Sequence, residues 1–299
     1  MIVVTGATGN VGRPLVAELA AAGEQVLAVS RNITGEGLPA GVAAARANLA
    51  EFAQLRPVLA GAKALFLMLA PELNAPGAPA AELLELVAAA GVRRVVLLSS
   101  LVAGTRPAER WHGRMREFEA AVRVAGPEWT VLRPGAFASN AYAWAESVRE
   151  RRTVLAPFGE VAMPVLDPAD VAAVAAAALR EDGHRGRVWT LSGPEPITPR
   201  RQAEVLGELL GEKVEFVEQT REQARAHLVR FMPPQVADGS LEVLGAPLPE
   251  ESAVRPDVER VLGRPARSFA DWAAGALPAF RRAPAARPAQ APAQAETAA

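Results

Sequence analysis

The stretch IVVTGATGNVGRPLVAELAAAG, residues Ile2 to Gly23, decides the fold of this chain. Its first residues, Ile2 to Val4, form an apolar run without a polar break, which is typical of a strand buried on both faces. Beyond the glycines, apolar residues recur at helical spacing from Leu15 to Ala20, and Gly23 is a good helix stop. The stretch therefore predicts a strand, a glycine turn and a helix.

The three glycines of this turn each have a physical reason. Gly6 permits a sharp exit from the strand, Gly9 leaves the backbone open to a ligand, and Gly12 lets the helix pack close to the strand. The start of the helix offers unpaired N–H groups and a partial positive charge, which suit a pyrophosphate. A plain structural turn is the alternative. A strand before the turn and a helix behind it favour a dinucleotide.

The next apolar segment, EQVLAVSRN, predicts a second buried strand that ends at Ser30 and Arg31. A protein that binds NAD usually has an acidic residue near this point to bond the ribose hydroxyls. A guanidinium there can instead hold the 2′-phosphate of NADP with paired hydrogen bonds. We therefore expect NADP(H) as the cofactor, against the alternative that Arg31 is only a solvated surface residue.

The composition excludes several classes of protein. The chain has 299 residues, of which 50% are hydrophobic, and a formal net charge of −1, so nothing favours nucleic acid or an anionic membrane as a partner. It has no cysteine, and its three histidines are scattered, so the sequence shows no metal site. We see no signal peptide and no membrane-spanning run, and we expect a cytoplasmic protein.

Alternating strands and helices through the first half predict a doubly wound parallel Rossmann sheet of the α/β class. The more mixed second half predicts a smaller C-terminal lobe. We assign residues 1–153, with the returning segment 160–192, to an NAD(P)-binding domain. We assign residues 193–280 to a substrate-binding lobe, and we expect the Ala- and Pro-rich tail 281–299 to be disordered.

In such a sheet the ligand lies outside the carboxyl ends of the strands. We therefore expect one group of residues from the glycine turn and another from the strand ends to contact the cofactor, with Asn48 and Leu49 beside the adenine. The turn residues are Gly6, Thr8, Gly9, Asn10, Val11 and Gly12, and those at strand ends are Ser30, Arg31, Leu69, Ala70, Pro71, Ser99 and Ser100.

Two acidic residues in DPADVAAVAAAAL have a local explanation. Asp167 is placed to cap a helix that has Pro168 at its first position, and Asp170 lies in the first turn. We therefore assign no catalytic role to this pair. Thr198 is expected to cap a later helix in the same way.

The spacing of TGATGNVG resembles that of the short-chain dehydrogenase/reductase superfamily, in its extended and atypical branches. Together with LRPGAFASN, PVLDPADVAAVAAAAL, LSGPEPITPRRQ and RSFADWA, it makes the chain similar to the NmrA-like atypical branch, from Met1 to about Phe280. The resemblance implies that Pro134 to Phe137 border the nicotinamide and that Asn140 points into the pocket. Trp111, Trp144 and Phe137 are then candidates to line an apolar pocket, although core packing explains each equally well.

The catalytic pair of typical superfamily members is missing. Those enzymes use a tyrosine and a lysine one helical turn apart, whereas the only tyrosine here, Tyr142, is followed four residues later by Glu146. The only lysines are Lys63 and Lys213. This departure excludes the standard proton relay.

A helix is predicted from about Pro107 to Ala125, with His112, Met115, Arg116 and Glu119 on one face. Many relatives carry a histidine and a glutamate four apart on this helix, and these align with Met115 and Glu119. His112 lies one turn earlier and is our candidate catalytic residue, as a proton donor. The alternative is structural: Arg116 pairs with Glu119, and the helix packs against a second subunit in a homodimer.

Two functions follow from this reading. The first is an NADPH-dependent reductase of a small, mostly apolar carbonyl, quinone, imine or enone, because the cofactor carries most of the chemistry. The second is a non-catalytic NADP(H) sensor that binds a partner protein according to redox state. The resemblance implies that both kinds occur in this branch.

Overall fold

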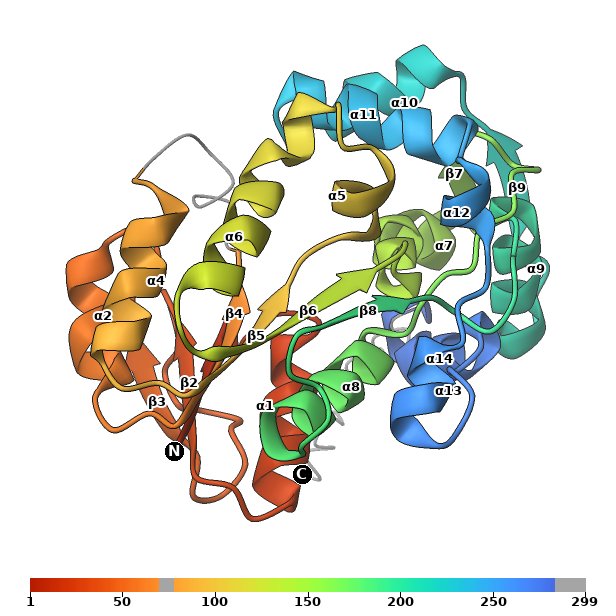
Figure 1. Cartoon of the computed structure of the whole chain (residues 1–299). Coiled ribbons are helices and arrows are strands. Elements are labelled where there is room, and N and C mark those ends of the chain that lie inside the picture. Colours follow the sequence, from red (N-terminus) through yellow and green to blue (C-terminus); the bar gives the residue numbers. More distant parts are fainter. Residues whose placement is uncertain (70–77, 283–299) are drawn as a thin grey trace, which may run out of the picture.

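A computed structural model describes residues 1–69 and 78–282. A seven-stranded parallel sheet forms its centre, in the order β3-β2-β1-β4-β5-β6-β8 (Figure 1). The strands are β1 (Ile2–Thr5), β2 (Val26–Ser30), β3 (Ala43–Arg46), β4 (Ala64–Met68), β5 (Arg94–Leu98), β6 (Glu128–Pro134) and β8 (Arg187–Leu191). The order reverses between β1 and β4, so the predicted doubly wound topology is confirmed.

Helices cover both faces of the sheet. One core packs α1 (Gly12–Ala21), α8 (Pro168–Arg180) and α13 (Asp257–Leu262) against the sheet. The opposite core packs α2 (Phe52–Leu59), α4 (Ala80–Ala89) and α6 (Gly113–Val124). The central strands are apolar on both faces because both faces are buried. Phe66 of β4, for example, has no exposed surface.

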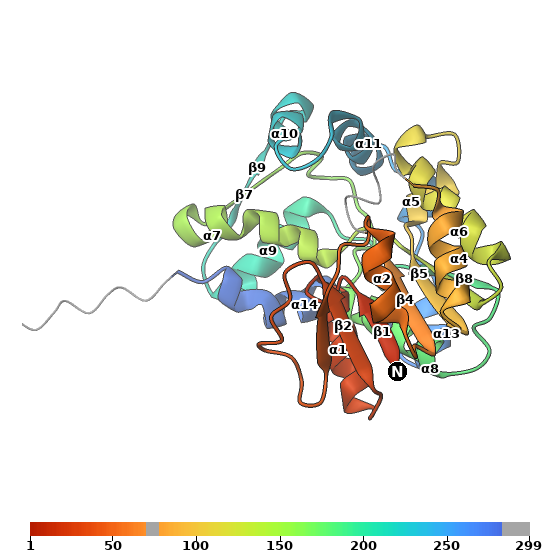
Figure 2. The same cartoon turned by 90° about the vertical axis from the view of Figure 1, so that its left-hand side faces the viewer.

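A smaller lobe contains a second parallel sheet of β7 (Thr153–Ala156) and β9 (Glu215–Glu218). Its own core includes α7 (Ala145–Arg151), α9 (Pro199–Leu210) and α14 (Phe269–Ala276). Two further helices, α10 (Arg221–Leu228) and α11 (Pro234–Gly245), lie beyond the carboxyl ends of the strands (Figure 2). This lobe therefore stands over the edge at which Rossmann proteins bind their ligands.

The lobe is tied to the main sheet by a buried ion pair. Arg106 follows α5 (Leu101–Thr105) and donates through Nε and Nη2 to the two carboxylate oxygens of Glu251, at 2.9 and 3.0 Å. Glu251 lies in α12 (Pro249–Ser252), is 2% exposed, and also accepts from Thr105 at 2.7 Å. The connection fixes the segment that approaches the carboxyl end of β8.

Both expected helix caps are confirmed. Asp167 accepts from the N–H of Ala169, and Thr198 accepts from that of Arg201. Asp170 is fully buried and accepts from Arg264 and from the N–H of Arg267. Both acidic residues thus have structural partners.

The helix expected from Pro107 to Ala125 is wrong in its first part. A 3₁₀ turn, Arg110–His112, precedes α6, which begins at Gly113. The helix α13 ends at Leu262, because Gly263 adopts φ +66° directly after it.

The domain boundaries remain assignments from sequence, although β7 pairs within the lobe and α13 packs on the main sheet. Beyond Arg282 the predicted disordered tail lies outside the described residues. None of the helices in the described ranges is long and apolar enough to cross a membrane.

Candidate functional site

The glycine turn between β1 and α1 has the geometry that its sequence predicts. Gly6 has φ +64°, which a side chain disfavours, and a Cβ on Gly12 would stand 2.1 Å from the Gly6 carbonyl oxygen. A Cβ on Gly9 would meet that oxygen at 3.2 Å and otherwise only Met68, at 3.8 Å. Gly6 and Gly12 are therefore needed to build the turn, whereas Gly9 leaves its outer side free.

The start of α1 is suited to an anion. Val11 occupies the N-cap position, and no side chain accepts a hydrogen bond from the first turn. The helix end thus presents N–H groups and the positive end of its dipole toward the turn. A pyrophosphate fits this donor set, as it does in other glycine turns of this kind.

The end of β2 lies beside the turn. The hydroxyls of Thr8 and Ser30 are 3.0 Å apart, and an Nη2–H of Arg13 approaches the Thr8 carbonyl oxygen at 3.5 Å. Arg31 follows directly and is exposed. Two hydroxyls and basic side chains therefore gather where the adenosine ribose of a bound dinucleotide would lie.

The glycine turn also contacts the segment that follows β6. Asn10 donates through Nδ2 to the hydroxyl of Ser139 at 3.2 Å, across the carboxyl edge of the sheet. Pro134 is buried at the end of β6, and Phe137 packs partly buried against the core. The segment expected to hold the pyrophosphate and the segment expected to border the nicotinamide are thus brought together.

Other expected contact residues have different surroundings. The side chains of Leu49 and Leu69 are 7% exposed and belong to the core, so only their backbone can border a ligand. Asn48 accepts from the N–H of Ala50. Ser100 caps α5, and the N–H of the exposed Asn140 donates to Phe137. Ala70 and Pro71 lie outside the described residues.

A buried carboxylate lies at the ends of β5 and β6. The sequence analysis did not predict that it is hydrogen-bonded to residues of both strand ends. Glu119 of α6 is 4% exposed and accepts from the hydroxyl of Ser99 at 2.6 Å. Arg133 of β6 donates to the same carboxylate through Nε at 2.9 Å and Nη2 at 2.6 Å. Burial acts to raise the pKa of Glu119, but the hydrogen bonds from Arg133 and Ser99 overcome it, and the pKa lies below its usual value.

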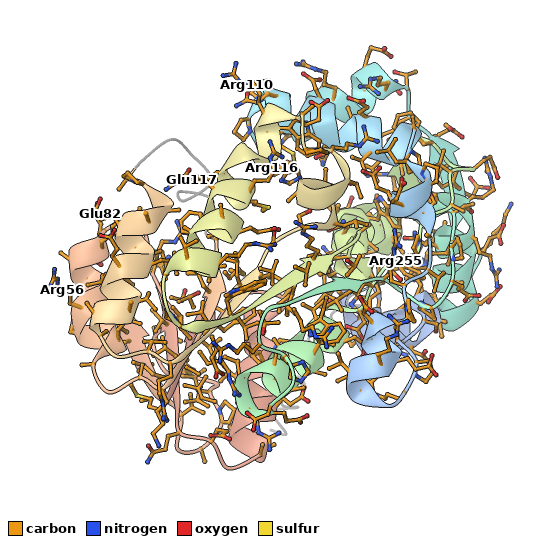
Figure 3. The ribbon with its side chains drawn as sticks, in the orientation of Figure 1. Arg56, Glu82, Arg110, Arg116, Glu117 and Arg255 are labelled. Carbon is orange, nitrogen blue, oxygen red and sulfur yellow. The ribbon has the colours of Figure 1, made fainter. Side chains whose placement is uncertain are left out.

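The expected pairing of Arg116 with Glu119 is therefore wrong. Arg116 donates instead to the carbonyl oxygens of Arg106 and Glu109, near the amino end of α6 (Figure 3). Glu119 faces inward, toward the sheet, because Arg133 and Ser99 offer it better-matched donors in a buried place. Only the tertiary structure brings Glu119, Arg133 and Ser99 together. The motif LRPGAFASN marks the end of a strand but does not show which residue pairs with Arg133.

His112 lies at the N-cap of α6, before its first turn. Its ring packs on Trp111, with the ring centroids 4.2 Å apart. Burial, followed by the charge of Arg116, lowers the pKa of His112 to about 4. The imidazole is thus neutral near pH 7, which makes it a poor proton donor.

The remaining candidates do not assemble a proton relay. Tyr142 is 44% exposed and contacts Trp272 and Phe280 in the lobe. Lys63 lies at the amino end of the sheet, where its N–H donates to Met1, and Lys213 pairs with Glu215 on the surface.

The aromatic pocket candidates are mainly packed side chains. Trp111 lies so close to Gly239 of α11 that a Cβ there would stand 2.2 Å from its ring. Trp144 packs against the core of the lobe. No group of three metal-binding side chains occurs among residues 1–69 and 78–282.

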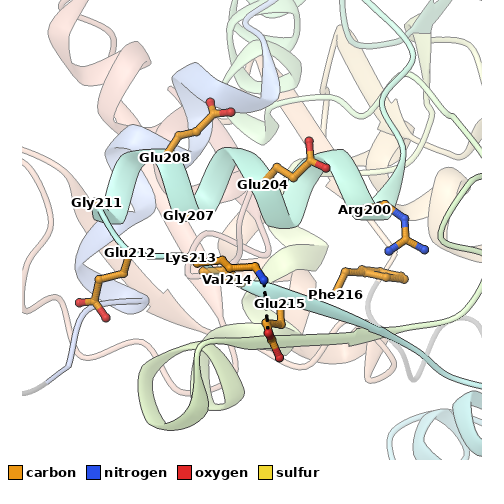
Figure 4. A pocket seen from close by; sticks show the side chains of 10 residues that line it. All are labelled: Arg200, Glu204, Gly207, Glu208, Gly211, Glu212, Lys213, Val214, Glu215 and Phe216. Carbon is orange, nitrogen blue, oxygen red and sulfur yellow. Dashed lines mark hydrogen bonds and ion pairs between the residues drawn. The ribbon is translucent and has the colours of Figure 1, made fainter.

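A hollow of about 790 Å³ lies elsewhere, between α9 and β9 (Figure 4). Its lining is mostly charged. Lys213 pairs with Glu215 at 3.5 Å, and the other charged lining residues pair with residues outside the lining, as Arg200 does with Glu160 and Glu212 with Arg152. The hollow is in the lobe, away from the glycine turn, and contributes nothing to the edge described above.

The fold and this edge define a dinucleotide-binding Rossmann protein. Residues 6–182 match the family model described as NAD(P)H-binding. The chain belongs to that NAD(P)H-binding family.

Two curated relatives cover nearly the whole chain. The (4-alkanoyl-5-oxo-2,5-dihydrofuran-3-yl)methyl phosphate reductase of Streptomyces griseus is 40% identical, over 94% of this chain and 99% of its own length. The NAD(P)H azoreductase of Xenophilus azovorans is 31% identical, with the same coverage.

Two solved structures are similar in fold. The NADPH complex of the quinone oxidoreductase QOR2 of Escherichia coli has a TM-score of 0.76 and 26% identity, with 91% of this chain and 98% of that chain covered. The transcriptional regulator NmrA with NADP has a TM-score of 0.70 and 18% identity, with 93% and 95% covered. At that identity NmrA shows the fold alone.

Proposed function

We propose that this protein is an NADPH-dependent reductase of a small, mostly apolar substrate whose reacting group is an alkene or another double bond conjugated with a carbonyl. The observation that carries the proposal is the carboxyl edge built by the glycine turn, the end of β2 and the segment after β6, which Asn10 and Ser139 hold together at 3.2 Å. The 40% identity with a reductase over 94% of the chain supports it.

The residues present fit the cofactor. In the proposal, Gly6, Gly9 and the start of α1 hold the pyrophosphate, and Ser30 with Arg31 holds the 2′-phosphate. Pro134 and Phe137 border the nicotinamide, and Ser99 with Asn48 completes the lining of the edge. When bound, the reduced cofactor supplies a hydride.

The overall reaction adds one hydride and one proton across the double bond. The hydride would come from the reduced cofactor and the proton from the proton source named below, so atoms and charge would balance. Because the pKa of His112 is lowered to about 4, the proposed proton source is water or the bound substrate. The work of this chain is to hold the reactants together.

The alternative is a sensor that binds NADP(H) without turnover. Its support is the fold shared with the regulator NmrA and the missing Tyr–Lys pair. One experiment separates the two functions: oxidation of NADPH is followed with a panel of quinones, enones and azo dyes, beside a blank without substrate. Turnover of a panel member supports the reductase. No turnover, with clearly different affinities for NADPH and NADP⁺, supports the sensor.

A further inference from the structure

Arg255 carries an unusual nitrogen atom. Among the described residues, its Nε is the buried side-chain nitrogen or oxygen that has no hydrogen-bond partner. A buried N–H without an acceptor costs free energy, and native structures generally avoid it. An acceptor supplied by a ligand removes that cost.

Two acidic neighbours of Arg255 have other partners. Glu251 is committed to Arg106, and Asp257 to Arg260 and to the N–H of Thr190. The guanidinium is fixed on one side only, where Nη2 donates to the carbonyl oxygen of Glu250 at 2.8 Å. A partly buried guanidinium held in place by a neutral carbonyl is prepared to accept an anion.

The position of Arg255 links it to the cofactor edge. Its backbone N–H donates to the hydroxyl of Ser192 at 2.8 Å, and Ser192 follows β8 directly. In the same place the N–H of Gly135, just after β6, donates to Leu191 at 2.9 Å. Figure 3 shows Arg255 beside the ends of these two strands. The residue is thus anchored next to the segment proposed to border the nicotinamide.

We propose that Arg255 binds a phosphate monoester carried by the substrate. This inference rests on the proposed reductase function and names its substrate class: a conjugated enone with a phosphate ester a few bonds from the reacting double bond. A phosphate offers three acceptor oxygens to the N–H groups of one planar guanidinium. The name of the Streptomyces griseus relative's substrate contains both groups.

The test compares two substrates that differ only in the phosphate. These are a (4-alkanoyl-5-oxo-2,5-dihydrofuran-3-yl)methyl phosphate and the corresponding alcohol, each with saturating NADPH. The variants are Arg255→Met and Arg255→Lys, with Arg185→Met as a matched control. Arg185 precedes β8 at the opposite end of the strand, and its side chain is 77% exposed. Thermal melting verifies that each variant folds.

In the wild type we expect kcat/KM for the phosphate to exceed that for the alcohol by about 10- to 100-fold, through KM. Arg255→Met removes this preference, Arg255→Lys keeps part of it, and Arg185→Met keeps all of it. Inorganic phosphate competes with the ester in the wild type and not in Arg255→Met. Competition by inorganic phosphate without any preference for the ester overturns the substrate assignment.

The experiment distinguishes failure of the phosphate site from failure of the reductase function. If both compounds turn over equally well, or if Arg255→Met keeps the preference, the phosphate site is wrong and the reductase function stands. If neither compound turns over, calorimetry measures the binding of the ester to the protein saturated with NADP⁺. This binding still tests the phosphate site. Binding that Arg255→Met abolishes supports the site, and binding that the variant retains, or none at all, refutes it.

Discussion

Glu119 of α6 and Arg133 of β6 form a two-point ion pair, with Nε–Oε1 at 2.9 Å and Nη2–Oε2 at 2.6 Å. The carboxylate is 4% exposed, and it also accepts from the hydroxyl of Ser99 at 2.6 Å and from Nη2 of Arg123 at 3.5 Å. The pair connects the ends of β5 and β6 with the helix above them. It thereby fixes the part of the edge on which the nicotinamide is proposed to lie.

We predict that Glu119→Gln destabilises the protein, because it leaves the Arg133 guanidinium without its counter-charge. The expected loss is about 2–3 kcal/mol in the free energy of unfolding, below the usual range for a buried pair since Arg133 is partly exposed. Chemical denaturation measures it. Glu85→Gln, on the exposed side of α4, is the control and should change little. An unchanged stability for Glu119→Gln contradicts the role of the pair.

We predict that two substitutions in the glycine turn have different effects, one on cofactor binding and one on stability. Gly9→Val should fold and lose NADPH binding, because its side chain enters the outer space of the turn. Gly12→Ala should lower the melting temperature instead, because its Cβ would stand 2.1 Å from the Gly6 oxygen. Circular dichroism and NADPH titration measure both. A folded Gly9→Val that binds normally shows that the phosphates lie elsewhere.

We predict that NADPH binds more tightly than NADH, through Ser30 and the exposed Arg31. Arg31→Ala should lose about 10- to 100-fold in NADPH affinity and nothing in NADH affinity, as expected for one charge-assisted interaction. Isothermal calorimetry with both cofactors measures this. Equal affinities in the wild type refute the assignment.

The titration of His112 should not contribute to the pH dependence of turnover between pH 6 and 8, because its pKa is lowered to about 4. His112→Ala should slow turnover of a good substrate by less than about tenfold, below the usual effect of a general acid. A thousandfold loss would make His112 the proton donor after all.

The lowered pKa of His112 also makes the stability of the protein depend on pH. Below its ordinary pKa of 6.5 the unfolded chain binds a proton at His112 that the folded chain does not bind until about pH 4. Stability therefore falls as the pH drops from 6.5 to 4. His112→Asn should reduce this fall. Melting temperatures of both proteins across that pH range measure the effect, and parallel curves contradict it.

The sequence by itself determined the parallel sheet, the glycine turn and the caps at Asp167 and Thr198. Each of these is encoded locally: apolar runs mark buried strands, glycines mark the turn, and a capping side chain bonds the N–H groups two or three residues ahead. The same local logic failed at residues 107–112, where helical spacing continues although the chain forms a 3₁₀ turn. The spacing of side chains along the sequence does not show at which residue the hydrogen bonds of the α-helix begin.

Only the tertiary structure decided which charges meet. Arg116 lies one helical turn before Glu119, and sequence spacing paired them, but the carboxylate bonds Arg133 and Ser99 on two strands. The orphaned Nε of Arg255 is equally invisible in the sequence, because it depends on acidic neighbours having other partners. A buried ion pair forms between groups that folding desolvates together, and their distance along the chain has no part in that choice.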